Sequence, residues 1–163
     1  MSTLGVYTDN LSAPQDDQSW LVNRKSDGIQ SVTLDLASFV TDDSKYFASL
    51  GADDTVGYLK SGIPLARIAT GDKQGEYGPY DKSATDGRET AIEGVLESQI
   101  QVSFTRSGLK SVSDSAGMRY MGVVNTAKLP GDITGAVWHG EFSDNHQDGS
   151  PILALSVAPA KAA

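Results

Sequence analysis

Two histidines and three acidic residues lie close together near the C-terminus, in the segment HGEFSDNHQD that runs from His139 to Asp148. Imidazole and carboxylate groups at short spacing can bind a metal ion or transfer protons. The spacing does not match the HExxH helix of zinc enzymes, and it fails the calcium-binding EF-hand loop because His146 stands where Asp or Asn is needed. We interpret the segment as polar residues at the junction of a strand and a turn, and we expect no metal and no cofactor.

Other candidate catalytic groups have equally generic spacings. Ser143 and Ser150 lie near the histidines, but the chain has no G-x-S-x-G motif to expose a serine nucleophile. Residues 70–75 contain glycines and a lysine but lack the Gly-Lys-Ser/Thr ending of a phosphate-binding loop. Adjacent aspartates such as Asp53 and Asp54 would point to opposite faces of a strand, so they could not cooperate as acid and base. The sequence therefore predicts a protein that is not an enzyme.

The composition is that of one acidic domain. The chain has 163 residues, no cysteine and a formal net charge of -8. A chain of this length buries about 68–70% of its unfolded surface, so it needs neither metal nor disulfide to fold. The absence of a Lys/Arg cluster argues against a nucleic-acid partner. The sequence has no signal-peptide pattern and no apolar run of membrane-spanning length, so we expect a soluble protein without membrane contact.

The elements that must position these groups are clearest between residues 57 and 104. Gly, Pro and Asp-Gly turns separate four candidate strands there, and from Ile92 to Phe104 every second residue is apolar, Gly or Ser. This period of two predicts a long half-buried strand, or a hairpin bent near Ser98. Glycines recur along the chain about every ten residues, which is typical of short strands and turns. The sequence therefore predicts a mainly β fold with one or two short helices (α+β).

Local patterns predict the remaining elements. Expected are a half-buried strand at 32–36, a short helix at 44–50, strands at 56–59 and 63–69 joined as a tight hairpin, a long loop at 70–85, an exposed turn region at 106–117, a strand or short helix at 119–124, a strand at 136–142 and a last strand at 153–157. Pro64 suggests an edge position for the second strand of the hairpin, because proline cannot donate to a ladder.

The first 27 residues are predicted to form an extended arm, and residues 28–163 a β-rich domain. Two apolar clusters interrupt the arm: Leu4, Val6 and Tyr7, and then Trp20, Leu21 and Val22. A solvated tail has little use for large aromatic rings, which become buried when they find a surface. The two clusters either fold back on their own domain or dock on a partner.

Several turns and strands together resemble a known family. The segments are YLKSGIPLARI, GEYGPYD and DGRETAIEGVL, with SDGIQSVTLDLASF upstream. This pattern, spanning residues 26–104, resembles the head decoration proteins of tailed bacteriophages, the family of the lambda decoration protein. The resemblance implies a compact β-barrel or β-tulip-like domain that forms a homotrimer.

The resemblance also implies a function as a capsid cement protein. The trimer would bind the major capsid protein on the outside of the expanded icosahedral head, at three-fold positions, and stabilise it against packaged-DNA pressure. The protein would be found on the virion surface, and in the host cytoplasm during assembly. The expected capsid-binding residues are Val6, Tyr7, Trp20, Leu21 and Val22, and the expected trimer or capsid contact loop contains Asp72, Lys73, Glu76, Tyr77, Pro79 and Tyr80.

A second hypothesis is a soluble β-sandwich module that binds carbohydrate on a cell or virion surface. Such a site needs exposed aromatic rings beside polar groups. The aromatic residues available for it are Tyr77, Tyr80 and Trp138, with His139 as a polar neighbour.

Overall fold

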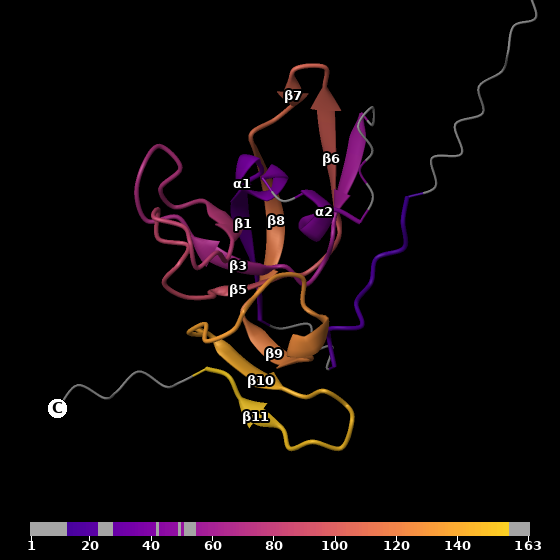
Figure 1. Cartoon of the computed structure of the whole chain (residues 1–163), viewed down its shortest axis with the longest axis vertical. Helices are drawn as coiled ribbons and strands as arrows, with labels where there is room; N and C mark the ends of the chain where they lie inside the picture. The colour runs from indigo at the N-terminus through magenta and orange to yellow at the C-terminus, as the bar shows by residue number, and fades with distance from the viewer. Residues whose placement is uncertain (1–12, 23–27, 42, 49, 51–54, 157–163) are drawn as a thin grey trace, which may run out of the picture.

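The computed structural model describes residues 13–22, 28–41, 43–48, 50 and 55–156. Short strands form most of the regular structure, so the prediction of a mainly β fold is confirmed (Figure 1). The strands are β1 (Ile29–Asp35), β2 (Val56–Leu59), β3 (Pro64–Arg67), β4 (Tyr77–Pro79), β5 (Gly94–Leu96), β6 (Ile100–Thr105), β7 (Gly108–Leu109), β8 (Ser113–Arg119), β9 (Met121–Val124), β10 (Glu141–Asp144) and β11 (Leu153–Ala154). The helical segments are α1 (Ala37–Val40), α2 (Asp43–Tyr46) and the 3₁₀ turn η1 (Thr126–Lys128).

Five strands pair in a closed ring, in the order β1-β4-β3-β5-β8. The longest contact is the antiparallel pair of β1 and β8, which runs from Ile29 opposite Arg119 to Asp35 opposite Ser113. Side chains alternate between the two faces of a strand, so Val32 and Leu34 of β1 share the inner face and are buried. They pack with residues of α1, α2, β2 and β6 in the first of two hydrophobic clusters.

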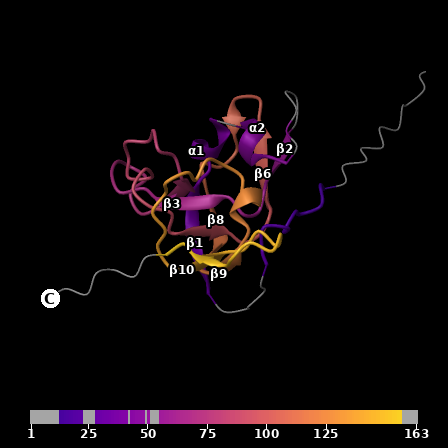
Figure 2. The same cartoon turned by 60° about the horizontal axis from the view of Figure 1, so that its bottom comes forward.

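Two three-stranded sheets flank the ring. The sheet β2-β6-β7 lies at one end of the molecule and the sheet β11-β10-β9 at the other (Figures 1 and 2). A second hydrophobic cluster, which includes Trp20, Val95, Val124, Trp138 and Phe142, packs between the ring and the sheet β11-β10-β9. The two clusters thus hold three small sheets together as one body.

The predicted hairpin of 56–59 and 63–69 is wrong. β2 pairs with β6, whereas β3 lies inside the ring between β4 and β5. The connection leaves one sheet for the other because the N–H of Lys60 donates to Tyr46 and that of Gly62 donates to Leu96. Pro64 is the first residue of β3, a position that tolerates its missing donor, and it is not at an edge.

The long alternating segment bends near Ser98, but it is neither the single strand nor the hairpin that were expected. β5 ends at Leu96 and β6 begins at Ile100, and the two strands belong to different sheets. The backbone N–H of Gln99 donates to the Asp16 carboxylate instead of to a neighbouring strand. The bend therefore passes the chain from the ring to the sheet β2-β6-β7.

Three polar segments were predicted incorrectly. Residues 106–117, expected as an exposed turn, contain most of β8, in which Asp114 and Ser115 are exposed while Ala116 and Met118 are buried. The loop predicted at 70–85 contains β4, which completes the ring. The helix predicted at 44–50 is the shorter α2, and α1 follows β1 directly where no helix was placed.

Candidate functional site

Residues 13–22, which we call the strap, lie along the side of the domain. Trp20 is only 1% exposed, and its Nε1–H donates to Ser61 Oγ at 3.2 Å. The Ser61 hydroxyl donates in turn to the carbonyl of Asp17 at 2.9 Å. A Cβ atom on Gly62 would lie 2.6 Å from the Trp20 ring, so only glycine leaves room for the indole. Trp20 is therefore an anchor within its own chain.

The rest of the strap is also held by the domain. Leu21 forms an antiparallel bridge with Val124, and Gln99 Nε2 donates to the Pro14 carbonyl at 3.0 Å. Val22, like Leu21, is half-buried, and its N–H donates to the Val123 carbonyl at 3.0 Å.

These contacts bear on the predicted arm and its capsid-binding residues. The boundary predicted after residue 27 assigns the strap to the arm, whereas residues 13–22 pack as part of the domain. Of the predicted capsid-binding residues, Trp20 is covered by its own chain and presents no surface to a partner in this structure. Val6 and Tyr7 lie outside the described residues.

The predicted contact loop divides into a surface part and a buried part. Lys73 Nζ lies 3.3 Å from both carboxylate oxygens of Glu76 and 2.7 Å from Ser113 Oγ. Ser113 Oγ also donates to Glu76 at 2.9 Å, and Asp72 is exposed beside this group. The loop at 71–76 is thus tied to the beginning of β8.

Tyr77, Pro79 and Tyr80 do not lie in that loop. Tyr77 and Pro79 are the ends of β4, and Pro79 is buried. Tyr80 follows the strand and is 7% exposed. Burial raises the pKa of the Tyr80 hydroxyl, and the negative charges of Asp132 and Asp81 raise it further. Pro79 and Tyr80 form part of the wall of a polar hollow.

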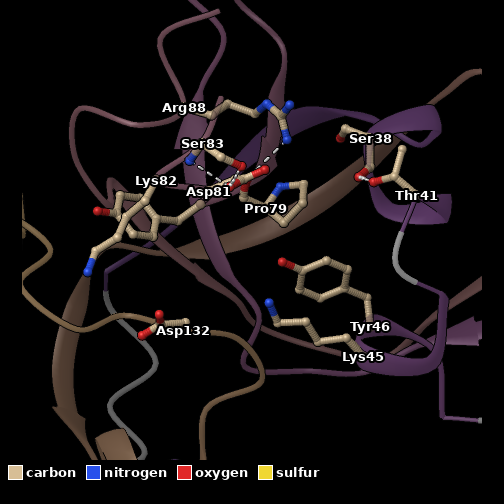
Figure 3. Close-up of a pocket in the computed structure, with 11 residues that line it drawn as sticks. Ser38, Thr41, Lys45, Tyr46, Pro79, Asp81, Lys82, Ser83, Arg88 and Asp132 are labelled. Carbon is tan, nitrogen blue, oxygen red and sulfur yellow. Dashed lines mark hydrogen bonds between the residues drawn. The ribbon is translucent and has the colours of Figure 1, made fainter. Parts of the chain in front are cut away.

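This first hollow has a volume of about 380 Å³ and lies where α1, α2, the segment after β4 and the segment after η1 meet (Figure 3). Its lining residues are Ser38, Thr41, Lys45, Tyr46, Pro79, Tyr80, Asp81, Lys82, Ser83, Arg88 and Asp132. The volume is within the range of about 300–1,000 Å³ that is usual for small-ligand sites.

Two motifs of the sequence build one wall of the first hollow. Arg88 from the DGR segment runs across Gly78 of β4, where a Cβ would lie 2.7 Å from Arg88 Cδ and 2.6 Å from Ser38 Oγ. Its Nη1 donates to the Pro79 carbonyl at 3.3 Å, and its Nε binds Asp86 at 2.9 Å. Gly78 is therefore required by the close approach of two side chains.

The carboxylates of the first hollow are stabilised in their ionised form. The pKa of Asp81 is lowered mainly by hydrogen bonds from the hydroxyl and N–H of Ser83, and less by the charges of Arg88 and Lys45. The pKa of Asp132 is lowered mainly by hydrogen bonds from Thr134, with smaller effects of Lys82 and Lys45. The first hollow thus mixes fixed negative charges with three cations.

The two histidines contact different carboxylates and lie apart from each other's partners. His139 Nδ1 is 2.7 Å from Glu93 Oε1, whereas His146 Nε2 is 3.0 Å from Asp144 Oδ2 and 3.1 Å from Thr126 Oγ1. Within the described ranges, no group of three or more His, Cys, Asp or Glu residues is arranged to hold a metal ion. The segment 139–148 contains β10 and the turn that follows it, as the strand-turn interpretation predicted.

The aromatic residues named for carbohydrate binding do not form an exposed platform. Trp138 is 4% exposed and packs against Phe142 with ring centroids 5.2 Å apart. Tyr80 is buried as well, and Tyr77 is only half-buried within β4. A sugar would find no open face on Trp138 or Tyr80 in this conformation.

Sequence reasoning missed several residues of the first hollow. Lys45, Lys82 and Asp132 come from segments that are far apart in the chain, and none of them belongs to a recognisable motif. Arg88 had a signal in the Asp-Gly-Arg turn, but its position over Gly78 depends on the pairing of β3 with β4.

Comparison with known proteins assigns no family to this chain. No protein family, curated protein or solved structure matches it. In the part of the chain that the structure describes, no helix is long and apolar enough to cross a membrane.

Proposed function

We propose that this protein is a capsid decoration protein of a tailed bacteriophage. It binds the major capsid protein on the outside of the expanded head as a trimer at three-fold positions, and stabilises the shell against packaged-DNA pressure. The support is the resemblance of residues 26–104 to that family, together with the mainly β fold built by those residues. The finer shape that the family implies, a β-tulip-like barrel, is part of the proposal.

The observation that carries the proposal is where the resembling segments lie. SDGIQSVTLDLASF contains β1, GIPLARI contains β3, GEYGPYD contains β4 and AIEGVL contains β5. These are consecutive neighbours in the ring, whose remaining strand is β8. The segments that carry the resemblance therefore build one connected unit, as is expected when turns and strands encode a shared fold.

Glycines of the same segments have specific packing roles. Gly62 leaves room for Trp20, and Gly78 for Ser38 and Arg88. A Cβ on Gly94 would lie 2.4 Å from the carbonyl oxygen of Arg119. These motifs are thus explained by close packing and not by a reaction, which favours a structural role.

The proposed capsid contacts are Val6 and Tyr7 of the N-terminal segment, with the strap as the base of the arm. An extended segment can add a strand to an exposed sheet edge, where main-chain hydrogen bonds give affinity and side chains give specificity. Three such arms in a trimer would bind about 10²–10⁴-fold more tightly than one, if all engage at once. Leu21 and Val22 remain candidates only for their half-buried surface.

The surface part of the contact loop is the second proposed contact. Lys73 and Glu76 are held together and to Ser113, so this loop presents a fixed shape to a neighbouring subunit or to the capsid. Asp72 is exposed at the same place.

The test combines solution mass with head binding. Light scattering gives the mass of the purified protein, and sedimentation with expanded, undecorated heads of its own phage measures binding. We expect saturable binding to heads, and loss of binding when residues 1–12 are deleted. The matched control keeps these residues and carries the exposed substitution Lys110→Ala, and we expect it to bind like the full chain.

Two results would contradict the proposal. One is a protein that ignores heads at every concentration tested. The other is a deletion of residues 1–12 that binds as well as the full chain, which would overturn the role of Val6 and Tyr7 while leaving head binding itself in place. A thermal melt of the deletion variant that matches that of the full chain shows that any loss of binding is not a loss of folding.

A further inference from the structure

A second polar hollow adjoins the first. It has a volume of about 370 Å³, and its lining residues are Gln15, Asp17, Lys45, Ala48, Lys60, Ser61, Gln99, Ala127, Lys128, Leu129 and Pro130. Lys45 lines both hollows. The strap therefore forms one wall of the second hollow, and α2 lies between the two.

The segment after η1 also connects the hollows. Leu129 and Pro130 line the second hollow and Asp132 lines the first. Between them, a Cβ on Gly131 would lie 3.7 Å from Lys45 Cε, which is ordinary van der Waals contact. The two hollows are thus neighbouring sites that share Lys45 and lie on either side of Gly131 in the chain.

Cations are concentrated around the two hollows. The lining includes Lys45, Lys60, Lys82, Arg88 and Lys128, which are five of the 13 Lys and Arg residues of the chain. It includes Asp17, Asp81 and Asp132, which are three of the 21 Asp and Glu residues. The chain as a whole has a net charge of -8, so this region has the opposite charge balance to the rest of the protein.

The lysines offer donors, whereas the acids are already bonded within their own turns. Lys82 and Lys128 are exposed, and Lys60 donates one bond from its ammonium, which has three N–H groups, to the Lys45 carbonyl at 2.9 Å. Asp17 accepts a bond from the Ser19 N–H at 3.0 Å.

Asp17 of the second hollow stays ionised at neutral pH, as Asp81 and Asp132 of the first hollow do. Hydrogen bonds from Ser19 lower the pKa of Asp17, and the Lys128 charge lowers it a little further. The charge of Lys128 therefore acts inside the second hollow, as that of Lys82 acts inside the first.

We propose that the two hollows bind an acidic segment of a partner polypeptide, with one carboxylate beside Lys82 and another beside Lys60 and Lys128. A peptide can present two carboxylates on a neutral backbone, which suits two separated cationic positions in an otherwise acidic protein. A nucleic acid carries a charge at every step, so the surrounding negative surface would repel it. This inference goes beyond the capsid proposal and does not rest on the 71–76 loop, which lines neither hollow.

Fluorescence anisotropy tests the site with a labelled eight-residue peptide of glycine and serine that carries two glutamates, which we call the acidic peptide. We expect saturable binding that weakens as salt is added, and weaker binding of labelled octalysine and of an eight-nucleotide oligo-dT. The double variant Lys82→Glu and Lys128→Glu should lose about tenfold in affinity, since two exposed charge pairs become repulsive. The matched control is Lys110→Glu with Arg67→Glu, which makes the same charge change at exposed positions outside both hollows.

The control variant decides between a site and a general charge effect. If Lys110→Glu with Arg67→Glu weakens binding of the acidic peptide as much as the hollow variant does, the proposal is wrong. It is also wrong if the acidic peptide does not bind, or if oligo-dT binds equally well, which would indicate a nucleic-acid surface instead. Lys82→Gln with Lys128→Gln serves as a second variant, and should lose part of the affinity with an unchanged thermal melt.

Discussion

The strap and the C-terminal hairpin of β10 and β11 are two apolar segments in polar sequence, and they differ in how far their apolar side chains are buried. Trp20 of the strap is 1% exposed, whereas Ile152 and Leu153 at β11 are 63% and 60% exposed. The strap is bonded to Ser61 and Gln99, which lie in connections between strands, and to β9 of the sheet β11-β10-β9. β11 pairs with β10 alone in its sheet and lies at the edge.

The difference shows what an isolated apolar cluster does and does not indicate. Such a cluster predicts a contact, but its sequence does not say whether the contact is within the chain or with a partner. Trp20 contacts residues more than 40 positions away, including Ser61 and Val124. The sequence around Trp20 therefore could not predict these contacts. Burial in the fold separates the two cases, and mutations at the two segments should separate them in solution.

The largest expected effect is that of Trp20→Ala. The indole is fully enclosed between the ring and the sheet β11-β10-β9, so its loss leaves a cavity and removes the bond to Ser61. We expect a loss of about 3–5 kcal/mol in the free energy of unfolding. Urea denaturation followed by circular dichroism measures it.

Leu153→Ala is the matched control for that substitution. It removes an apolar side chain that is mostly exposed, so we expect a change within about 0.5 kcal/mol. Equal losses at the two positions would show that the strap is no more integrated than the hairpin.

The next effect is that of Gly62→Ala. Gly62 has a φ of 79°, and the added Cβ would meet the Trp20 ring at 2.6 Å. Strain of about 1 kcal/mol from the left-handed backbone adds to about 1–3 kcal/mol from the clash. Thermal denaturation of Gly62→Ala should therefore show a clear loss of stability.

Gly71→Ala is the control that introduces backbone strain without a clash. Gly71 has a φ of 86° but no atom within 4 Å of an added Cβ. It should lose only the strain, about 1 kcal/mol. If both glycine variants lose the same amount, Trp20 does not occupy the space beside Gly62.

A smaller effect is expected for Ser61→Ala. The Ser61 hydroxyl accepts from the Trp20 indole and donates to the Asp17 carbonyl, and it is 2% exposed. Its removal leaves a buried donor and a carbonyl without this partner, which costs about 1–3 kcal/mol. Combining Ser61→Ala with Trp20→Ala should cost less than the sum of the two changes, because they share one bond.

Sequence patterns predicted those parts of the fold whose signals are local. The alternation of Val32, Leu34 and Leu36 gave β1, and β2 was placed with its observed bounds, because side-chain period depends only on neighbouring residues. Strand partners were not predictable in the same way. β8 was missed because the exposed Asp114 begins the face that carries Ala116 and Met118, so these two buried residues gave too weak an alternation.

The candidate sites depended even more on distant contacts. The loop at 71–76 was found from its glycines, but its link to Ser113 spans about forty residues of sequence. The first hollow combines α1, α2, the segment around Asp81 and the segment around Asp132, and no periodic or motif signal connects these pieces. A turn can be predicted from its own residues, whereas a hollow requires the strand order.

The smallest expected effect compares two aspartates of the same local motif. Asp17 in the strap and Asp148 in the hairpin turn each accept a bond from the N–H of a serine two positions later, Ser19 and Ser150. In both cases the serine is the main cause that lowers the pKa of the carboxyl below 3.8. Each group therefore stabilises the fold above pH 3.8, and this contribution is lost as the pH falls through the lowered pKa.

Substitution of the two aspartates should nevertheless change the midpoint of thermal unfolding by different amounts. Asp17→Asn should lower the midpoint of thermal unfolding at pH 7, and the difference from the unsubstituted protein should shrink as the pH is taken below 3.8. Asp148→Asn should leave that midpoint unchanged, because an exposed turn beyond an edge strand can open without the core. Melts at a series of pH values measure both. Equal, pH-dependent shifts for the two variants would show that the hairpin unfolds together with the strap, and that exposure at β11 does not mark a separately opening segment.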